Sequence, residues 1–84
     1  MEQVNFETLV YELVKPLTAY PNDIVVKTFS EQDDVISLHV IVNKDDLGRV
    51  IGKQGRVANA IRTIAYAAAA RQHKKLQIEI ESFE

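Results

Sequence analysis

Apolar residues recur every three to four positions near the start of the chain, which is the spacing of a helix with one buried face. These positions are Phe6, Leu9, Val10, Leu13, Val14 and Leu17. Asn5 is a good N-cap before this stripe, and Pro16 disfavours a helical conformation at the residue before it. The pattern therefore predicts a helix over residues 5–15.

An alternation of apolar and polar positions, which is typical of strands, follows in three later segments. It is clearest over residues 35–42, where Ile36, Leu38, Val40 and Val42 share one face. A β-branched run covers residues 24–30, and the last segment, residues 76–81, places Leu76, Ile78 and Ile80 on one face. We expect three strands over these ranges, with a polar hairpin loop at residues 31–34.

Helical patterns return between the second and third strands. Asn43 or Asp45 can cap a short helix over residues 44–50, and a longer helix follows over residues 56–71. Its expected buried stripe is Val57, Ile61, Ile64 and Ala68, and the opposite side carries Ala58, Asn59, Arg62, Thr63, Tyr66, Ala69 and Ala70. The alanines on that side reflect high helix propensity, or they let a second chain approach closely. The candidate dimer contacts are Arg62, Tyr66, Ala69 and Ala70.

The element order is therefore α-β-β-α-α-β. Apolar strand faces and helix stripes combine into two layers, a three-stranded sheet with helices packed on one face. A chain of 84 residues supports one domain with one modest core. The expected fold is a single α+β domain over residues 1–84.

Three glycines lie close together in the sequence, at Gly48, Gly52 and Gly55. The spacing excludes a P-loop, because Gly48 and Gly52 are one residue too close and Gln54 stands where a hydroxyl is needed. A dinucleotide fingerprint is excluded because Val50 stands where it needs a glycine. What remains is a G-x-x-G turn between two helices, whose free backbone N–H groups favour anions. A tight helix–turn–helix with no ligand is the plainer alternative.

The net charge of −2 is unevenly distributed along the chain. Residues 1–43 carry a balance of −5, residues 44–75 carry +6, and residues 76–84 carry −3. The positive charge thus gathers around the glycine turn and the helix after it. Such asymmetry favours a local anion site on an otherwise acidic protein, although a solvated helix with ordinary surface charges fits as well.

Composition narrows the function classes further. The chain has no cysteine, which excludes disulfides and thiolate chemistry and makes a reducing cytoplasm the easiest location. It has no apolar run long enough to cross a membrane, and its acidic start does not resemble a signal peptide. We see no nucleophile–base set, carboxylate pair or metal-ligand cluster. We therefore expect no enzyme, cofactor, metal or small-molecule substrate.

The stretch Leu47-Gly48-Arg49-Val50-Ile51-Gly52-Lys53-Gln54-Gly55-Arg56, followed by Ile61-Arg62 and Ile64, resembles the signature of KH domains. A leading helix and a closing strand resemble the type II, bacterial arrangement. The length, the opening helix that ends in Lys15-Pro16-Leu17, and the turn at residues 20–24 resemble the small bacterial KhpA family. The resemblance covers nearly the whole chain.

The resemblance implies that single-stranded RNA is held at the G-x-x-G loop, residues 52–55. The loop residues would then be Gly52, Lys53, Gln54 and Gly55, flanked by Arg49 and Arg56 as candidate phosphate contacts. Val50, Ile51 and Val57 are candidates for the base groove or for the core, and the sequence does not divide those two roles. Single-stranded DNA is a lesser alternative ligand, because only contacts to the 2′-hydroxyl distinguish it.

The same resemblance implies partners and cellular roles. Members of the family pair with themselves and with a larger KH protein, KhpB (also called Jag), in RNA chaperone activity or post-transcriptional regulation, cell elongation and cell-wall homeostasis. The main alternative is a protein–protein interaction module that dimerises and has little intrinsic RNA affinity. The acidity of the chain and the alanine-rich side of the long helix favour it, whereas Lys53 and Arg56 argue against it.

Overall fold

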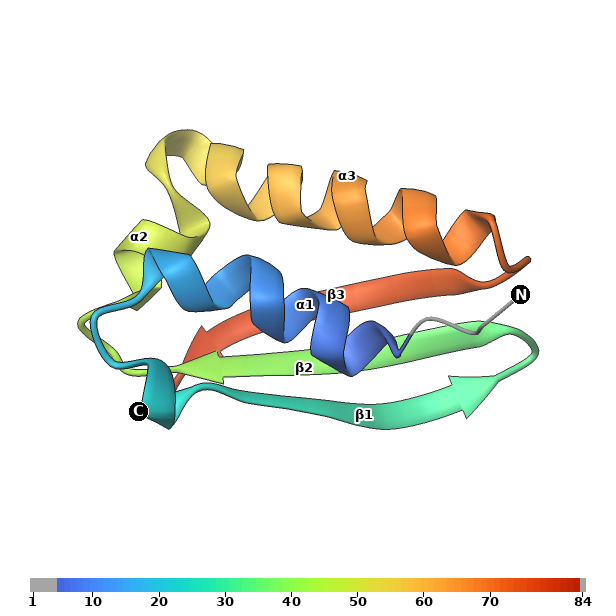
Figure 1. Ribbon diagram of the computed structural model, residues 1–84, viewed down its shortest axis with the longest axis horizontal. Coiled ribbons are helices and arrows are strands. Elements are labelled where there is room, and N and C mark those ends of the chain that lie inside the picture. The colour runs from blue at the N-terminus through green and yellow to red at the C-terminus, as the bar shows by residue number, and fades with distance from the viewer. Residues whose placement is uncertain (1–4, 84) are drawn as a thin grey trace.

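The computed structural model describes residues 5–83 and arranges them in two layers, with α-helices lying above a β-sheet (Figure 1). The helices are α1 (Phe6–Val14), α2 (Leu47–Ile51) and α3 (Arg56–Ala70). The strands are β1 (Val25–Gln32), β2 (Val35–Val42) and β3 (Lys75–Ser82). Single turns of 3-10 helix, η1 (Lys15–Leu17), η2 (Pro21–Asp23) and η3 (Lys53–Gly55), lie between them. The predicted α+β class and element order are confirmed.

The sheet has the order β1-β2-β3, so that β2 is central and the other two strands are edges. β1 pairs antiparallel with β2, and β3 pairs parallel with β2, with Leu38 opposite Ile78. Parallel neighbours need a long crossover connection, which α2, the glycine turn and α3 provide here. This connection places α2 and α3 on the same face of the sheet as α1 (Figure 1).

The hairpin between β1 and β2 is tighter than the sequence indicated. Glu31 and Gln32, which were expected in the loop, pair with Ile36 and Val35. Only Asp33 and Asp34 remain in the turn, and both have positive φ, 53° and 67°. Two-residue turns with positive φ at both positions match the right-handed twist of the flanking strands, and aspartate tolerates this conformation better than most residues.

α1 is one residue shorter at each end than the predicted range 5–15, because Asn5 and Lys15 are its cap residues. The side chain of Asn5 accepts a hydrogen bond from the Thr8 N–H at 3.1 Å, which satisfies one free donor of the first turn. Phe6, Val10 and Val14 are buried against the rest of the core. At the other end, Pro16 lies in η1, and the chain leaves the helix there.

The predicted stripe of α3 is wrong by part of a turn. The buried residues of this helix are Ala58, Ile61, Ala65 and Ala69, whereas Ile64 is 51% exposed. The expectation placed the largest aliphatic side chains inward. In the structure, three alanines face inward instead, and small side chains let a helix axis lie close to the layer it covers. Ala69 therefore belongs to the core rather than to the outer surface.

The sheet face away from the helices is not covered by any element of residues 5–83 (Figure 1). His39 lies on this face, with its Nε2 2.8 Å from a carboxylate oxygen of Glu81. The ring of Phe29 packs edge-on against His39, at 5.9 Å between centroids. His39 therefore has structural neighbours on an otherwise open face.

Candidate nucleic-acid interface

The glycine turn is built from backbone conformations that ordinary residues avoid. Gly52 has φ 76° and ψ 171°, Gln54 has φ 57°, and Gly55 has φ 76° and ψ 11°. A Cβ on Gly52 would also lie 2.8 Å from the backbone nitrogen of Val57 and would overlap the Val57 side chain. Gly52 is thus required for two reasons, its conformation and its packing, whereas Gly55 is required by conformation alone.

Gly48, the third glycine of the chain, differs from Gly52 and Gly55 in backbone conformation and surroundings. It lies within α2, its φ is not positive, and a Cβ built on it would meet no atom within 4 Å. Nothing in the fold of residues 5–83 therefore requires a glycine at this position.

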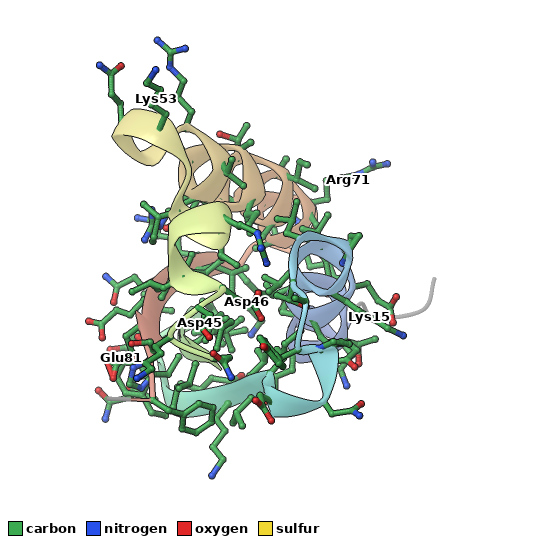
Figure 2. The ribbon with its side chains drawn as sticks, turned by 90° about the vertical axis from the view of Figure 1, so that its left-hand side faces the viewer. Lys15, Asp45, Asp46, Lys53, Arg71 and Glu81 are labelled. Atoms are coloured by element: carbon green, nitrogen blue, oxygen red, sulfur yellow. The ribbon has the colours of Figure 1, made fainter. Side chains whose placement is uncertain are left out.

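The turn stands at one end of the molecule, clear of the sheet. In Figure 2, which looks at this end, Lys53 lies at the outermost tip, whereas Asp45 and Glu81 lie on the opposite side, towards the sheet. Lys53, Gln54 and Arg56 are all exposed. The described C-terminal residues lie elsewhere, since the Phe83 N–H donates to the carbonyl of Val42 at the end of β2. The turn is therefore open to a ligand.

Several backbone amides of the turn are free of the hydrogen bonds that hold it. Gly52 donates to the carbonyl of Gly48 at 2.8 Å, Gly55 donates to Gly52 at 3.1 Å, and Arg56 donates to Lys53. The amides of Lys53 and Gln54 take no part in these bonds. The N-terminus of α3 has no side-chain cap, so no side chain caps the N–H groups that follow Arg56 in its first turn.

The charges of the turn have no acidic partners. Within residues 5–83, the ion pairs join His39 to Glu81, Arg49 to Asp46 and Lys74 to Asp34. Lys53 and Arg56 are in none of these pairs, and Arg56 makes only a long hydrogen bond of 3.4 Å to the side chain of Gln54. The end of the molecule that carries the turn is therefore locally positive, which suits an anion.

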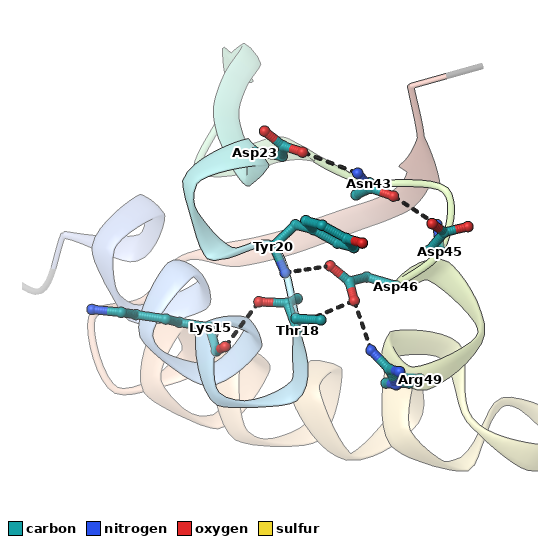
Figure 3. Close-up of polar contacts among 9 residues, drawn as sticks. Lys15, Thr18, Tyr20, Asp23, Asn43, Asp45, Asp46 and Arg49 are labelled. Atoms are coloured by element: carbon teal, nitrogen blue, oxygen red, sulfur yellow. Dashed lines mark hydrogen bonds and ion pairs between the residues drawn. The ribbon is translucent and has the colours of Figure 1, made fainter.

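Arg49, a predicted phosphate contact, is partly committed inside the protein. Its Nη1 lies 3.0 Å from Oδ1 of Asp46, and its side chain remains 60% exposed. The Asp46 carboxylate is fully buried and also accepts hydrogen bonds from the N–H groups of Ala19 and Tyr20, at 2.8 and 3.0 Å (Figure 3). One buried carboxylate thus ties the start of α2 to the segment between α1 and β1.

The sequence did not predict that Asp46 is buried, and the expectation that Asn43 or Asp45 caps α2 is wrong, since the N-cap residue is Asp46. Asn43 accepts from the Asp45 N–H at 2.8 Å and donates to Asp23 at 3.0 Å, so it closes a turn instead (Figure 3). This turn delays α2 until Leu47, three residues later than expected. Asp45 and Asp46 stand next to each other directly before α2 in the sequence. Their spacing alone does not show which of the two side chains turns into the protein.

The three groove candidates separate into two groups. Val50 is fully buried in the core and cannot contact a base. Ile51 and Val57 are half-buried beside the turn, and the Val57 side chain also packs against Gly52. Only Ile51 and Val57 therefore remain as candidates for an apolar contact with a ligand.

The candidate dimer residues are not brought together on one surface. Ala69 is buried, and Arg62 turns towards β3, where its Nε and Nη2 donate to the carbonyl of Ile78 at 3.2 and 3.1 Å. Tyr66 and Ala70 are exposed. Ile64 is not among the candidate dimer residues predicted from the sequence, because its apolar side chain was expected in the core.

Residues 5–83 contain neither a cluster of metal ligands nor a helix that could span a membrane. No three side chains of His, Cys, Asp or Glu gather there in a way that could hold a metal ion. None of the helices in this part of the chain is both long and apolar enough to cross a membrane.

Two bacterial proteins resemble this chain in sequence over most of its length. A protein of Listeria monocytogenes described as "RNA-binding protein KhpA" is 47% identical over 74 residues, which cover 88% of this chain and 96% of that protein. The protein of the same description from Bacillus subtilis is 46% identical over 80 residues, which cover 95% of this chain and 98% of the relative.

Among solved structures, a crystal structure of Aquifex aeolicus Era bound to GDP.AlF4- superposes with a TM-score of 0.70 at 23% identity. The match covers 92% of this chain and 30% of that one, and at this identity it supports the fold alone. The family model described as KhpA/KhpB, KH domain, matches residues 7–80. Together with the exposed G-x-x-G turn between α2 and α3, this match shows that the chain belongs to the KhpA/KhpB family of KH domains.

Proposed function

We propose that this protein binds single-stranded RNA at residues 52–55 and acts as an RNA chaperone or post-transcriptional regulator. The observation that carries the proposal is the exposed turn, which is kept free of side chains at Gly52 and Gly55 and is positively charged around them. The relatives described as RNA-binding proteins support the choice of ligand.

In the proposed complex, the backbone of the turn meets a phosphodiester. The free amides of Lys53 and Gln54 and the uncapped first turn of α3 donate to phosphate oxygens, and the N-terminal end of α3 adds a favourable dipole. A side chain at position 52 or 55 would strain the turn, and at position 52 it would also collide with Val57. The glycines therefore serve both the fold and the approach of the ligand.

The surrounding side chains supply the remaining contacts. Lys53 and Arg56 add charge interactions that salt screens, and Gln54 donates a hydrogen bond through its amide. Arg49 reaches the ligand with the guanidinium nitrogens that Asp46 does not hold. The half-buried Ile51 and Val57 give a base an apolar surface, and an unpaired base can be splayed onto such a surface.

A titration of fluorescently labelled single-stranded RNA octamers tests the proposal. The double variant Lys53→Asp with Gln54→Asp places two carboxylates at the turn, so we expect it to keep the fold and lose binding. The matched control, Arg71→Asp with Gln72→Asp, makes the same change of charge at the other end of α3 and should bind as the wild type does. Equal binding by the wild type and the turn variant would overturn the proposal.

We also propose that the protein forms a homodimer through the outer side of α3. Ile64 is 51% exposed there, and the exposed residues around it on this helix are small: Ala60, Thr63 and Ala67. A second copy of the same helix fits this surface, because small side chains let two helices approach and Ile64 of each copy is then withdrawn from water.

Sedimentation measurements test the dimer. Ile64→Glu keeps the monomer fold, because the side chain lies outside the core, and places a charge at the contact. We expect the wild type to be dimeric and the variant monomeric at the same concentration. Lys44→Glu, far from α3 in sequence and exposed, is the control. A wild type that is monomeric at high micromolar concentration would exclude the dimer.

Further roles follow from family membership. We propose a cytoplasmic location, no enzyme activity, and a heterodimer with KhpB (Jag) that acts in cell elongation and cell-wall homeostasis. Co-purification of tagged wild type and Ile64→Glu from cells tests whether KhpB uses the same helix.

The rival function is a dimerisation module with little intrinsic RNA affinity. The exposed side of α3 favours it, and the unpaired Lys53 and Arg56 speak against it. Titration of single-stranded RNA at two salt concentrations separates the two, because phosphate contacts make binding fall with salt. A normal dimer with no salt-sensitive RNA binding would identify the rival as correct.

A further inference from the structure

β1 forms an open edge of the sheet (Figure 1). It pairs only with β2, in an antiparallel ladder, so every second residue turns its N–H and C=O away from β2. Its eight residues exceed the usual strand length of about 5–6, and the side chains of residues 27–32 are all exposed. An edge of this kind pairs with a strand of another molecule unless some feature of the fold prevents it.

A side chain of α1 occupies the middle of this edge. The N–H of Thr28 donates to Oε2 of Glu7 at 2.8 Å, and the Thr28 hydroxyl donates to the same oxygen at 2.6 Å. Glu7 lies in the first turn of α1, which packs against β1. Within residues 5–83, Glu7 takes part in none of the ion pairs. Its carboxylate is therefore committed to a backbone donor that faces away from β2.

A β-bulge lies directly beside this contact. Thr28 pairs with Leu38 and Ser30 pairs with Ser37, so Phe29 has no partner on β2. The Phe29 ring is 58% exposed. A bulge interrupts the regular alternation of donors and acceptors and increases the local twist of a strand. The middle of β1 is thus protected twice, by a bound carboxylate and by an irregular backbone.

We infer that the outer edge of β1 is a strand-pairing surface for a second copy of this chain, and that the Glu7 carboxylate keeps it closed. The same strand of a second copy offers the same backbone donors and acceptors, and an antiparallel pair of identical strands has two-fold symmetry. β1 carries one positive side chain, Lys27, and one negative side chain, Glu31. Its net charge is zero, so two such strands do not repel each other.

The Glu7 contact opposes pairing because it is the stronger bond for this donor. A hydrogen bond to a carboxylate is about twice as strong as one between neutral groups. A second β1 strand would offer the Thr28 N–H only a neutral carbonyl, and Glu7 would lose both of its bonds to Thr28. Without the carboxylate, the Thr28 N–H needs water or another strand as its acceptor, and pairing becomes favourable.

Hydrogen exchange followed by NMR tests the contact in the wild type. Val26 lies two residues before Thr28 in the regular part of the ladder, so its N–H faces the same way, and no side chain of residues 5–83 accepts from it. After correction for intrinsic rates, we expect the Thr28 amide to exchange at least about tenfold more slowly than the Val26 amide, as a bond to a charged group requires.

Variants test the closed edge by sedimentation over a series of concentrations. All are made in the Ile64→Glu protein, so that the outer side of α3 does not contribute. Glu7→Ala should increase association, whereas Glu12→Ala, which removes the same charge from an exposed position of α1, should not. Adding Thr28→Pro to Glu7→Ala should restore the parent behaviour, because proline removes an N–H that does not pair with β2. Circular dichroism verifies that each variant is folded.

Each outcome decides the inference, and none depends on RNA binding at the turn. A Thr28 amide that exchanges as fast as that of Val26 overturns it, and this measurement needs no variant to fold. A folded Glu7→Ala protein that sediments like its parent overturns it as well, as does association that Thr28→Pro does not reverse. If the Ile64→Glu parent is already associated and Thr28→Pro dissociates it, the edge is open with Glu7 in place, and the role of Glu7 is refuted.

Discussion

Replacing each of the three glycines by alanine gives three different stabilities, because their surroundings differ. At Gly52, φ 76° with ψ 171° is a conformation that is essentially restricted to glycine and costs about 1–3 kcal/mol for other residues. The new Cβ would in addition lie 2.8 Å from the Val57 nitrogen. The loss for Gly52→Ala therefore reaches about 3 kcal/mol. For a domain of this size, that lowers the unfolding midpoint by about 12–24 °C.

The other two glycines provide the internal comparison. Gly55 has left-handed φ and ψ, and the nearest atom to a new Cβ is 4.0 Å away, so Gly55→Ala costs only the conformational term, about 1–2 kcal/mol. Gly48 lies in a helix with open space beside it. Gly48→Ala should therefore be stabilising, by up to about 1 kcal/mol.

Thermal unfolding followed by circular dichroism, at one protein concentration, measures all three variants. Urea unfolding with an unchanged slope verifies that the changes reflect stability rather than the compactness of the unfolded state. The expected order of midpoints is Gly48→Ala, wild type, Gly55→Ala, Gly52→Ala, from high to low. A Gly52→Ala variant as stable as Gly48→Ala would refute the proposed packing of the turn.

Three further predictions concern charged residues. Asp46→Asn replaces one of the two buried oxygens that accept from the Ala19 and Tyr20 amides by an NH2 donor and removes the charge that pairs with Arg49, so urea unfolding should show a loss of about 1–3 kcal/mol. Lys53→Ala should lower the slope of the logarithm of RNA affinity against the logarithm of salt concentration by about 0.7, the value for one phosphate contact with a single strand, as titrations over a salt series will show. The hydrogen bond and charge of Asp34 raise the pKa of Lys74 above 10.5, so the pair contributes stability at neutral pH and loses it as pH rises through the raised pKa. Midpoints of wild type and Lys74→Met should therefore converge at high pH, and a constant difference would contradict the assigned pairing.

Local patterns in the sequence were sufficient for the fold class, because each strand and helix carries its own period. The predicted strand over residues 35–42 coincides with β2. The alternation of buried and outward-facing positions starts and stops clearly at both ends of this segment. The turn at Asp33 and Asp34 and the late start of α2 depend on single dihedral angles and side-chain bonds. The spacing of apolar residues along the chain does not determine those angles and hydrogen bonds.

The candidate site was also only partly predictable from the sequence. The glycine spacing identifies the turn, because backbone conformation restricts the residue type there directly. Arg62, Ala69 and Ile64 were assigned to the wrong sides of α3, because an alanine-rich helix has no dominant apolar stripe and tertiary packing chooses its inner face. The buried position of Asp46 is not predictable from local patterns, because its partners at Ala19 and Tyr20 are 27 and 26 residues away in sequence.

The most direct test of RNA binding at the turn is a map of backbone amide shifts by NMR as a single-stranded RNA octamer is added. The account predicts that the largest shifts occur at Lys53, Gln54 and Gly55 and in the first turn of α3. It predicts small shifts on the uncovered sheet face around Phe29 and His39. Large shifts confined to that face, with the amides of residues 52–57 unchanged, would contradict the account.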